Sequence, residues 1–206
     1  MHRCGIPSHS IAWWLVIGCW ATVCVVWLLG SLYNYRHSGK VERRGSSGVW
    51  RIILVVNVLA LWLIPATTWD VFNVCAAWMA WAGAAVLLAG TAFTLWARFA
   101  LGTMWSAMPT RRTGHELRTD GPYRVTRHPI YTGLISMVLG TALLDGIGAI
   151  GPALVLIVVG LIFKLRIEER LMREAFGDAY VAYQQRVPGL LPWPRPRHER
   201  ISPMTP

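Results

Sequence analysis

The chain has 206 residues, of which 54% are hydrophobic and 15% are charged, with 20 basic and 10 acidic side chains. Soluble domains carry about 25% charged residues, so this composition favours an integral membrane protein of one compact domain over a soluble one. The net charge of +10 predicts no nucleic-acid partner, because the basic residues sit mainly in short segments between apolar stretches, as in cytoplasmic loops of membrane proteins.

The first half of the chain contains three long apolar stretches. Ile11–Leu32 would form a helix about 33 Å long, enough to cross a bilayer core. A cleaved signal peptide is the alternative, but the run is long for one and no clear cleavage site follows it. Val49–Thr67 and Val71–Ala100 are the second and third predicted spans. Small residues recur along the third span and allow close helix packing: Ala76, Ala80, Gly83, Ala84 and Gly90.

The second half contains two shorter apolar runs after a long polar loop, Leu101–His128. The runs Pro129–Leu144 and Ile147–Leu165 are joined by a very short turn, so they predict a tight helical hairpin. A charged helical extension follows, which we expect to end near Gly177, with Asp178 capping a short amphipathic helix. From Pro188 the chain is proline-rich, and we expect an extended cytoplasmic end.

These elements predict an all-α integral membrane protein with about five transmembrane helices, the last two forming a hairpin, plus a cytoplasmic C-terminal helical extension. Segments 34–51, 98–128 and 164 onward are rich in Lys and Arg, whereas 68–70 and 145–148 contain neither. The positive-inside rule therefore places the N-terminus outside and the C-terminus in the cytoplasm.

The sequence predicts no metal site. The four cysteines form no C-x-x-C pair, and all six histidines lie in loops or chain ends, which argues against a haem. The spans contain almost no charged residue, which argues against an ion or proton transporter.

Two polar clusters lie at the same membrane level. One is His115–Tyr131, and the other is Arg166, Glu168 and Glu169 at the end of the fifth span. A hairpin places the start of its first helix beside the end of its second, so we expect His128 and Tyr131 near Glu168. The N–H groups of the helix that starts at Pro129, with Arg127 and His128, would suit an anion. The glutamates offer the opposite charge, and the two together suit a zwitterionic ligand.

Simpler interpretations remain for these residues. Basic loops beside a membrane often only contact lipid headgroups, which applies to Arg111 and Arg112. An acidic pair at the end of a span can be a solvated helix face. Most of the twelve Trp residues are expected to be interface anchors or packing residues.

The combined motifs resemble the isoprenylcysteine carboxyl methyltransferases and the related bacterial membrane methyltransferases, including phospholipid N-methyltransferases. Over about residues 98–192, the shared blocks are Gly121-Pro-Tyr-Arg-x-x-Arg-His-Pro-x-Tyr-x-Gly133, Glu168-Glu-Arg-Leu and Phe176-Gly-x-x-Tyr180-x-x-Tyr-x-x-Arg-Val-Pro188. His115-x-Leu-x-Thr, before the first block, is also similar to the family. Arg-His-Pro-x-Tyr alone is less specific, because membrane sterol reductases carry a similar piece.

The resemblance implies S-adenosylmethionine as the cofactor. The implied cofactor residues, to which the anion-site argument adds Arg127, are His115, Glu116, Leu117, Arg118, Tyr123, His128, Pro129, Ile130, Tyr131 and Glu168. The family's substrate-facing arginine corresponds to Lys164, with Arg166 close by. A lysine does not reproduce a bidentate arginine, so the substrate group stays open. The predicted catalytic residues are Lys164, Arg166 and Glu169.

The predicted function is methyl transfer to a lipophilic acceptor that reaches the cytoplasmic membrane face from the bilayer. The acceptor group stays open: the carboxylate of a prenylcysteine-like or other lipid, or a lipid amine or thiol, and hence O-, N- or S-methylation. The alternatives are an NADPH-dependent sterol- or isoprenoid-type reductase and a non-catalytic membrane scaffold. We expect transmembrane helices 1–3 in residues 1–97, the methyltransferase region in 98–192, and a proline-rich tail in 193–206.

Overall fold

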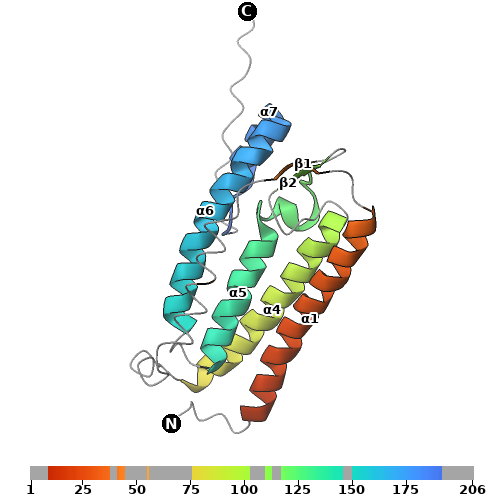
Figure 1. Cartoon of the computed structure of the whole chain (residues 1–206). Helices are drawn as coiled ribbons and strands as arrows, with labels where there is room; N and C mark the ends of the chain where they lie inside the picture. The colour runs from red at the N-terminus through yellow and green to blue at the C-terminus, as the bar shows by residue number, and fades with distance from the viewer. Residues whose placement is uncertain are drawn as a thin grey trace, which may run out of the picture.

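The computed structural model describes residues 9–37, 41–44, 55, 76–102, 110–112, 117–145 and 150–191. Figure 1 shows the long helices side by side, with the 3-10 turn, the strands and α7 at one end of the bundle. The helices are α1 (His9–His37), α4 (Ala77–Leu101), α5 (Pro129–Asp145), α6 (Ile150–Phe176) and α7 (Asp178–Arg186). The remaining elements are the strands β1 (Val41–Arg44) and β2 (Thr110–Arg112) and the 3-10 helix η3 (Gly121–Arg124).

The helices α1, α4, α5 and α6 lie where the first, third, fourth and fifth spans are predicted, and two of these described helices are long and apolar enough to cross a membrane. α1 and α4 contain stretches long and apolar enough to cross a membrane, Ile11–Asn34 and Trp78–Leu101. Only 11% and 33% of the most apolar part of these two stretches is buried, so neither is the enclosed core helix of a soluble protein. α5 begins at Pro129 as predicted, and its apolar part is shorter. The predicted second span lies outside the described residues.

The fifth predicted span and the charged extension form one continuous helix, α6, which ends before Gly177 as predicted. Gly177 has a φ of +51°, in the left-handed region that favours glycine. The prediction that Asp178 caps α7 is wrong. Gly177 occupies the cap position and no side chain bonds there, while Asp178 lies in the first turn.

α4 and α5 are antiparallel, and they form the closest helix pair among the described elements. Glycines remove the side chains that would hold the two backbones apart. A Cβ atom on Gly140 would lie 2.5 Å from the backbone nitrogen of Leu87, and one on Gly83 would lie 2.8 Å from the Gly140 carbonyl oxygen. Gly90 and Gly133 are in the same kind of close contact, about two helical turns further along α4. The predicted role of small residues in the third span is therefore confirmed at Gly83 and Gly90.

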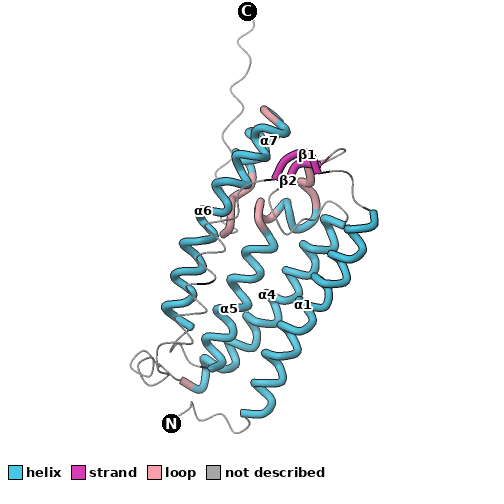
Figure 2. Tube along the Cα trace, viewed as in Figure 1, coloured by secondary structure: helices cyan, strands magenta, loops and turns pink. Residues whose placement is uncertain are grey.

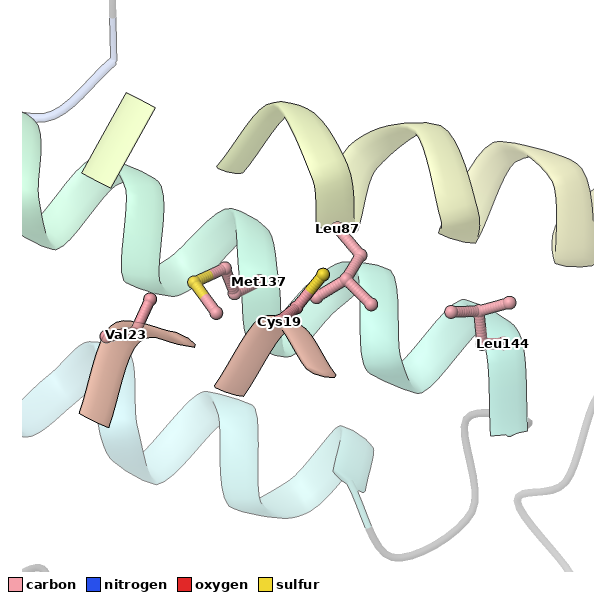
Figure 3. Close-up of a cluster of buried hydrophobic side chains, with 5 residues drawn as sticks. All are labelled: Cys19, Val23, Leu87, Met137 and Leu144. Atoms are coloured by element: carbon pink, nitrogen blue, oxygen red, sulfur yellow. The ribbon is translucent and has the colours of Figure 1, made fainter. Parts of the chain in front are cut away.

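α1 completes the core against this pair. Figure 3 shows five buried side chains that lie together from α1, α4 and α5: Cys19, Val23, Leu87, Met137 and Leu144. Trp20 on α1 also donates a hydrogen bond from Nε1 to Oγ1 of Thr141 on α5, at 3.2 Å. Nearer the other end of α1, Asn34 donates to the Gly102 carbonyl at 3.4 Å.

Large exposed aromatic side chains gather at two levels of α1 and α4. One group lies near the starts of the helices: Trp13, Trp14, Trp78 and Trp81. The other lies near their ends: Tyr33, Trp96 and Phe99. Trp14 and Tyr33, like Trp78 and Phe99, are about 30 Å apart along a helix. This separation matches the hydrocarbon thickness of a bilayer, whose two interfaces attract aromatic residues.

A two-stranded antiparallel sheet was not predicted. β1 follows α1 and β2 follows α4, and their pairing sets Arg43 opposite Arg111. Figure 2 shows the two strands beside η3 at one end of the bundle. The pairing joins the two basic loops at that end, as the charge pattern predicts.

Candidate functional site

The hairpin of α5 and α6 brings His128 and Glu168 together as predicted. His128 lies immediately before α5, and Glu168 lies in the last third of α6. Nδ1 of His128 is 3.7 Å from Oε2 of Glu168, and both side chains are more than four-fifths buried. Two residues 40 positions apart in the sequence thus share one polar cluster, at the end of the apolar part of the hairpin.

Tyr131 and Lys164 surround the same carboxylate. The Tyr131 hydroxyl donates a 2.6 Å hydrogen bond to Oε1 of Glu168. Nζ of Lys164, one turn before Glu168, lies 3.9 Å from that oxygen and 4.9 Å from the centre of the Tyr131 ring. The His128 and Tyr131 rings are stacked, with centroids 5.9 Å apart. Glu168 therefore lies at the centre of a cluster that contains the stacked rings of His128 and Tyr131 and the ammonium group of Lys164. We call these four residues the Glu168 cluster.

Glu169 points to a different partner, Arg127. Nε and Nη2 of Arg127 donate to one Glu169 oxygen, at 2.9 and 2.5 Å. Burial alone would raise the pKa of the Glu169 carboxyl, but the close approach of His128 and the hydrogen bonds and charge of Arg127 outweigh it and lower this pKa to about 2. Glu169 therefore remains ionised at neutral pH and anchors the Arg-His-Pro segment to α6.

The chain after α7 folds back onto the same segment. Nη1 of Arg127 donates to the carbonyls of Gln184 and Val187, at 3.1 and 2.6 Å. The backbone N–H groups of Arg127 and His128 donate to Pro188 and Gly189. The hydroxyls of two threonines also donate to this stretch, Thr126 to the Gly189 carbonyl and Thr132 to that of Leu190. We call residues 187–190 the return segment.

This arrangement corrects two expectations. The Arg127 guanidinium bonds to Glu169 and to backbone carbonyls of the chain itself, so it does not take part in the anion site expected at the start of α5. The start of the tail is also not a free extension, because Pro188 and Gly189 carry the carbonyls that receive the backbone N–H groups of Arg127 and His128. The Arg127 guanidinium acts as a structural clamp, because its planar set of N–H donors can bond to several acceptors at once.

Tyr123 lies in η3, and only 8% of it is exposed. The hydroxyl of Tyr183 on α7 donates a 2.6 Å hydrogen bond to the Tyr123 carbonyl. Burial raises the pKa of Tyr123, and the nearby Tyr183 and Glu168 add to this. Burial likewise raises the pKa of Tyr183 to about 12, so both phenols stay neutral and keep their protons.

The other predicted residues are less uniformly placed. Pro129 is buried at the first position of α5 and Ile130 is half-buried beside it, whereas Leu117 and Arg118 are half-buried before η3, where Arg118 pairs with Asp120 at 3.5 Å. Arg166 is exposed against the Phe163 ring, so the structure does not bring it into the Glu168 cluster. His115 and Glu116 lie outside the described residues.

Sequence reasoning missed the residues whose hydrogen bonds hold the segments around the cluster in place. Thr126 and Thr132 bond to the return segment, and Tyr183 bonds to η3. Tyr183 does stand in the Phe-Gly-x-x-Tyr-x-x-Tyr block, which is the only signal for it. The backbone carbonyls that receive Arg127 have no signal, because any residue supplies one.

One buried nitrogen of the cluster has an incomplete set of hydrogen bonds. Nε2 of His128 is buried and completes no hydrogen bond with any described residue, although it lies 3.4 Å from Oε1 of Glu169. Buried polar atoms normally have a partner. The cluster thus combines an incompletely bonded imidazole, a carboxylate and an ammonium, a set of groups that fits a ligand carrying both charges.

The chain matches a family profile described as phospholipid methyltransferase over residues 78–179, which include every residue of the cluster. Among curated proteins, it is 39% identical over 87 residues to protein-S-isoprenylcysteine O-methyltransferase B of Arabidopsis thaliana, an alignment covering 40% of this chain and 43% of that protein. It is 34% identical over 149 residues to methanethiol S-methyltransferase of Mycobacterium tuberculosis, covering 66% of this chain and 57% of that protein.

Among solved structures, the chain is similar to a eukaryotic intramembrane Ras methyltransferase, isoprenylcysteine carboxyl methyltransferase. The TM-score is 0.49 and the sequence identity 22%, over 70% of this chain and 51% of that one. The chain spans less than two thirds of the length of each of these three proteins.

Proposed function

This chain belongs to the phospholipid methyltransferase family of membrane methyltransferases, and on that basis we propose that it transfers a methyl group from S-adenosylmethionine to a lipophilic acceptor at the cytoplasmic face. The observation that carries the proposal is the Glu168 cluster. It lies within the matched region and joins His128, Tyr131 and Lys164 around one carboxylate.

In this proposal Glu168 and His128 hold the cofactor. S-adenosylmethionine would supply a methyl group bonded to a positively charged sulfur, and this sulfur would be the leaving group when an acceptor attacks the methyl carbon in line. Glu168 keeps Oε2 available to receive an N–H or O–H of the cofactor, because the Tyr131 hydroxyl bonds to Oε1. Nε2 of His128 can bond to a second polar group. Any carboxylate of the cofactor falls to His128 or Lys164, because Arg127 is occupied by Glu169 and backbone carbonyls.

The return segment and α7 act as positioning elements. They contact the segment that carries His128 and fix its backbone by accepting hydrogen bonds from the N–H groups of Arg127 and His128. Alignment of the reacting groups is the main requirement of a displacement reaction, so a rigid backing for His128 and Tyr131 contributes directly to the rate.

The acceptor we favour is a lipophilic carboxylate or thiol. The relatives named above are a methyltransferase of isoprenylcysteine oxygen and one of methanethiol sulfur. Such acceptors ionise without a strong base, whereas an amine must first lose a proton. Lys164 adds a positive charge beside the cluster, which attracts an anionic acceptor and repels an ammonium.

The test uses the purified full chain in lipid nanodiscs. Titration with S-adenosylmethionine should show saturable binding, and labelled methyl should pass from it into an acid or thiol fraction of a lipid extract. Glu168→Gln removes the charge at nearly unchanged volume, and we expect at least a tenfold loss of affinity. Asp178→Asn, at the exposed start of α7, is the matched control and should bind as the wild type does.

Two results would contradict the proposal. One is binding of NADPH with no binding of S-adenosylmethionine. The other is wild-type cofactor affinity in both Glu168→Gln and His128→Ala, which would show that the cluster is not the cofactor site.

A further inference from the structure

The exposed face of α6 changes from apolar to basic part of the way along the helix. Val155, Val159 and Phe163 are 62%, 44% and 48% exposed. The same face continues with three exposed arginines, Arg166, Arg170 and Arg173. All six positions follow one another at intervals of three or four residues, so they lie on one side of the helix.

The change occurs at the level of the second aromatic group on α1 and α4. Gly133 of α5 lies against Thr94, so Tyr131, about one half-turn above it, is level with Trp96. The hydrogen bond from Tyr131 to Glu168 then ties this level to α6. Phe163 lies about 7 Å toward the middle of the bundle from Glu168, whereas Arg170 and Arg173 lie beyond it.

Arg166 marks the boundary itself. Its guanidinium lies 6.0 Å from the centre of the Phe163 ring, as expected for a side chain that keeps its stem on an apolar surface and its charge in the headgroup layer. Glu168 is on the opposite face, directed at Tyr131, and Glu169 is paired with Arg127. Glu174, one turn after Arg170, is exposed on the same side of α6. The row therefore sets three positive charges against one negative charge and remains net basic.

We propose that the row Arg166, Arg170 and Arg173 binds the headgroups of anionic phospholipids. The apolar residues that precede the row on this face can contact the hydrocarbon chains of any phospholipid. The three arginines, spaced over about 10 Å, favour phospholipids with a negatively charged headgroup. The headgroup layer on one side of a bilayer is about 5–8 Å thick, so a row of this length reaches through it, and each basic residue near an anionic surface adds attraction. The interaction concerns the outside of α6, so it is independent of the proposed methyl transfer.

The experiment compares lipids in contact with the protein. The full chain is reconstituted in phosphatidylcholine vesicles with spin-labelled phosphatidylglycerol or phosphatidylcholine, and the protein-restricted fraction of each label gives their relative association. The wild type should prefer phosphatidylglycerol. In the variant R166Q/R170Q/R173Q the preference should fall roughly threefold. The variant R166K/R170K/R173K keeps the charges and should keep the preference.

A second control separates this surface from other basic residues at the same end. Arg186→Gln removes an exposed charge on α7 and should leave the lipid preference unchanged. The proposal is overturned if the wild type and the glutamine variant show the same preference, or if the wild-type preference is equally strong at high salt, where exposed charges are screened. Neither readout depends on enzymatic activity.

Discussion

The Arg127–Glu169 pair fastens the start of α5 to α6, and its strength depends on pH. The two side chains are 9% and 18% exposed, so water competes only weakly for their hydrogen bonds. The pKa of Glu169 falls from 4.5 to about 2 in the folded protein. A carboxyl with a lowered folded-state pKa stabilises the protein above its unfolded pKa, and this contribution is lost as the pH falls toward the folded value.

We therefore expect thermal stability in detergent to fall between about pH 5 and pH 2, by roughly 1–3 kcal/mol from this group. In Glu169→Gln, stability at pH 7 should be lower than in the wild type, because Arg127 loses its charged partner. The gap between the two proteins should narrow as the pH falls through this window. Tryptophan fluorescence on heating measures both. A gap that stays constant from pH 7 to pH 2 would show that the pair does not carry this pH dependence.

At the scale of the elements, the packing of α4 on α5 depends on glycine. Gly140 meets backbone atoms of Leu87 and Gly83, which cannot rotate away as a side chain could. Any added carbon must push the helices apart, and α5 carries Tyr131 at its other end. Changes in this contact should therefore reach the Glu168 cluster.

Gly140→Ala should destabilise the protein by about 1–3 kcal/mol, the usual cost of overpacking. Gly18→Ala on α1 is the matched control, because a Cβ atom there meets nothing within 4 Å. Alanine favours a helix over glycine, so the control should be neutral or slightly more stable. The melting temperatures of the two variants, measured in the same detergent, test this prediction. Equal decreases in melting temperature would mean that the close approach of α4 and α5 does not contribute to stability.

The helices and the His128–Glu168 contact could be predicted because their causes lie in the sequence. Apolar run lengths define α1, α4 and α5, and a short turn between two runs forces the ends of the hairpin together. The partners of Arg127 could not be predicted, since most are backbone carbonyls whose position depends on how the chain returns after α7. β1 and β2 were missed because short segments rich in arginine show no alternation of apolar residues.

At the scale of the whole molecule, two features describe how the protein sits in a bilayer. The aromatic groups on α1 and α4 mark two levels about 30 Å apart. The paired strands, η3 and the return segment all lie at the end where the basic residues gather. The Glu168 cluster lies at the same end, where the proposed acceptor in the bilayer and the proposed cofactor in water would meet.

We expect this end to face the cytoplasm. Fusion of a reporter after Pro206 that is active only in the cytoplasm should give signal, and the same reporter before Met1 should not. A reporter active only outside serves as the complementary control at both positions. Activity of the outer reporter after Pro206 would reverse the orientation and place the Glu168 cluster on the outer face.

The return segment also has a consequence for biosynthesis. Residues 187–190 leave the ribosome after α4, α5 and α6, yet their carbonyls receive the N–H groups and hydroxyls that hold the segment before α5. Until they are made, Arg127, His128 and Thr126 lack these acceptors. During synthesis the helices can therefore enter the membrane first, and the Glu168 cluster takes its final form only when almost the whole described chain has emerged.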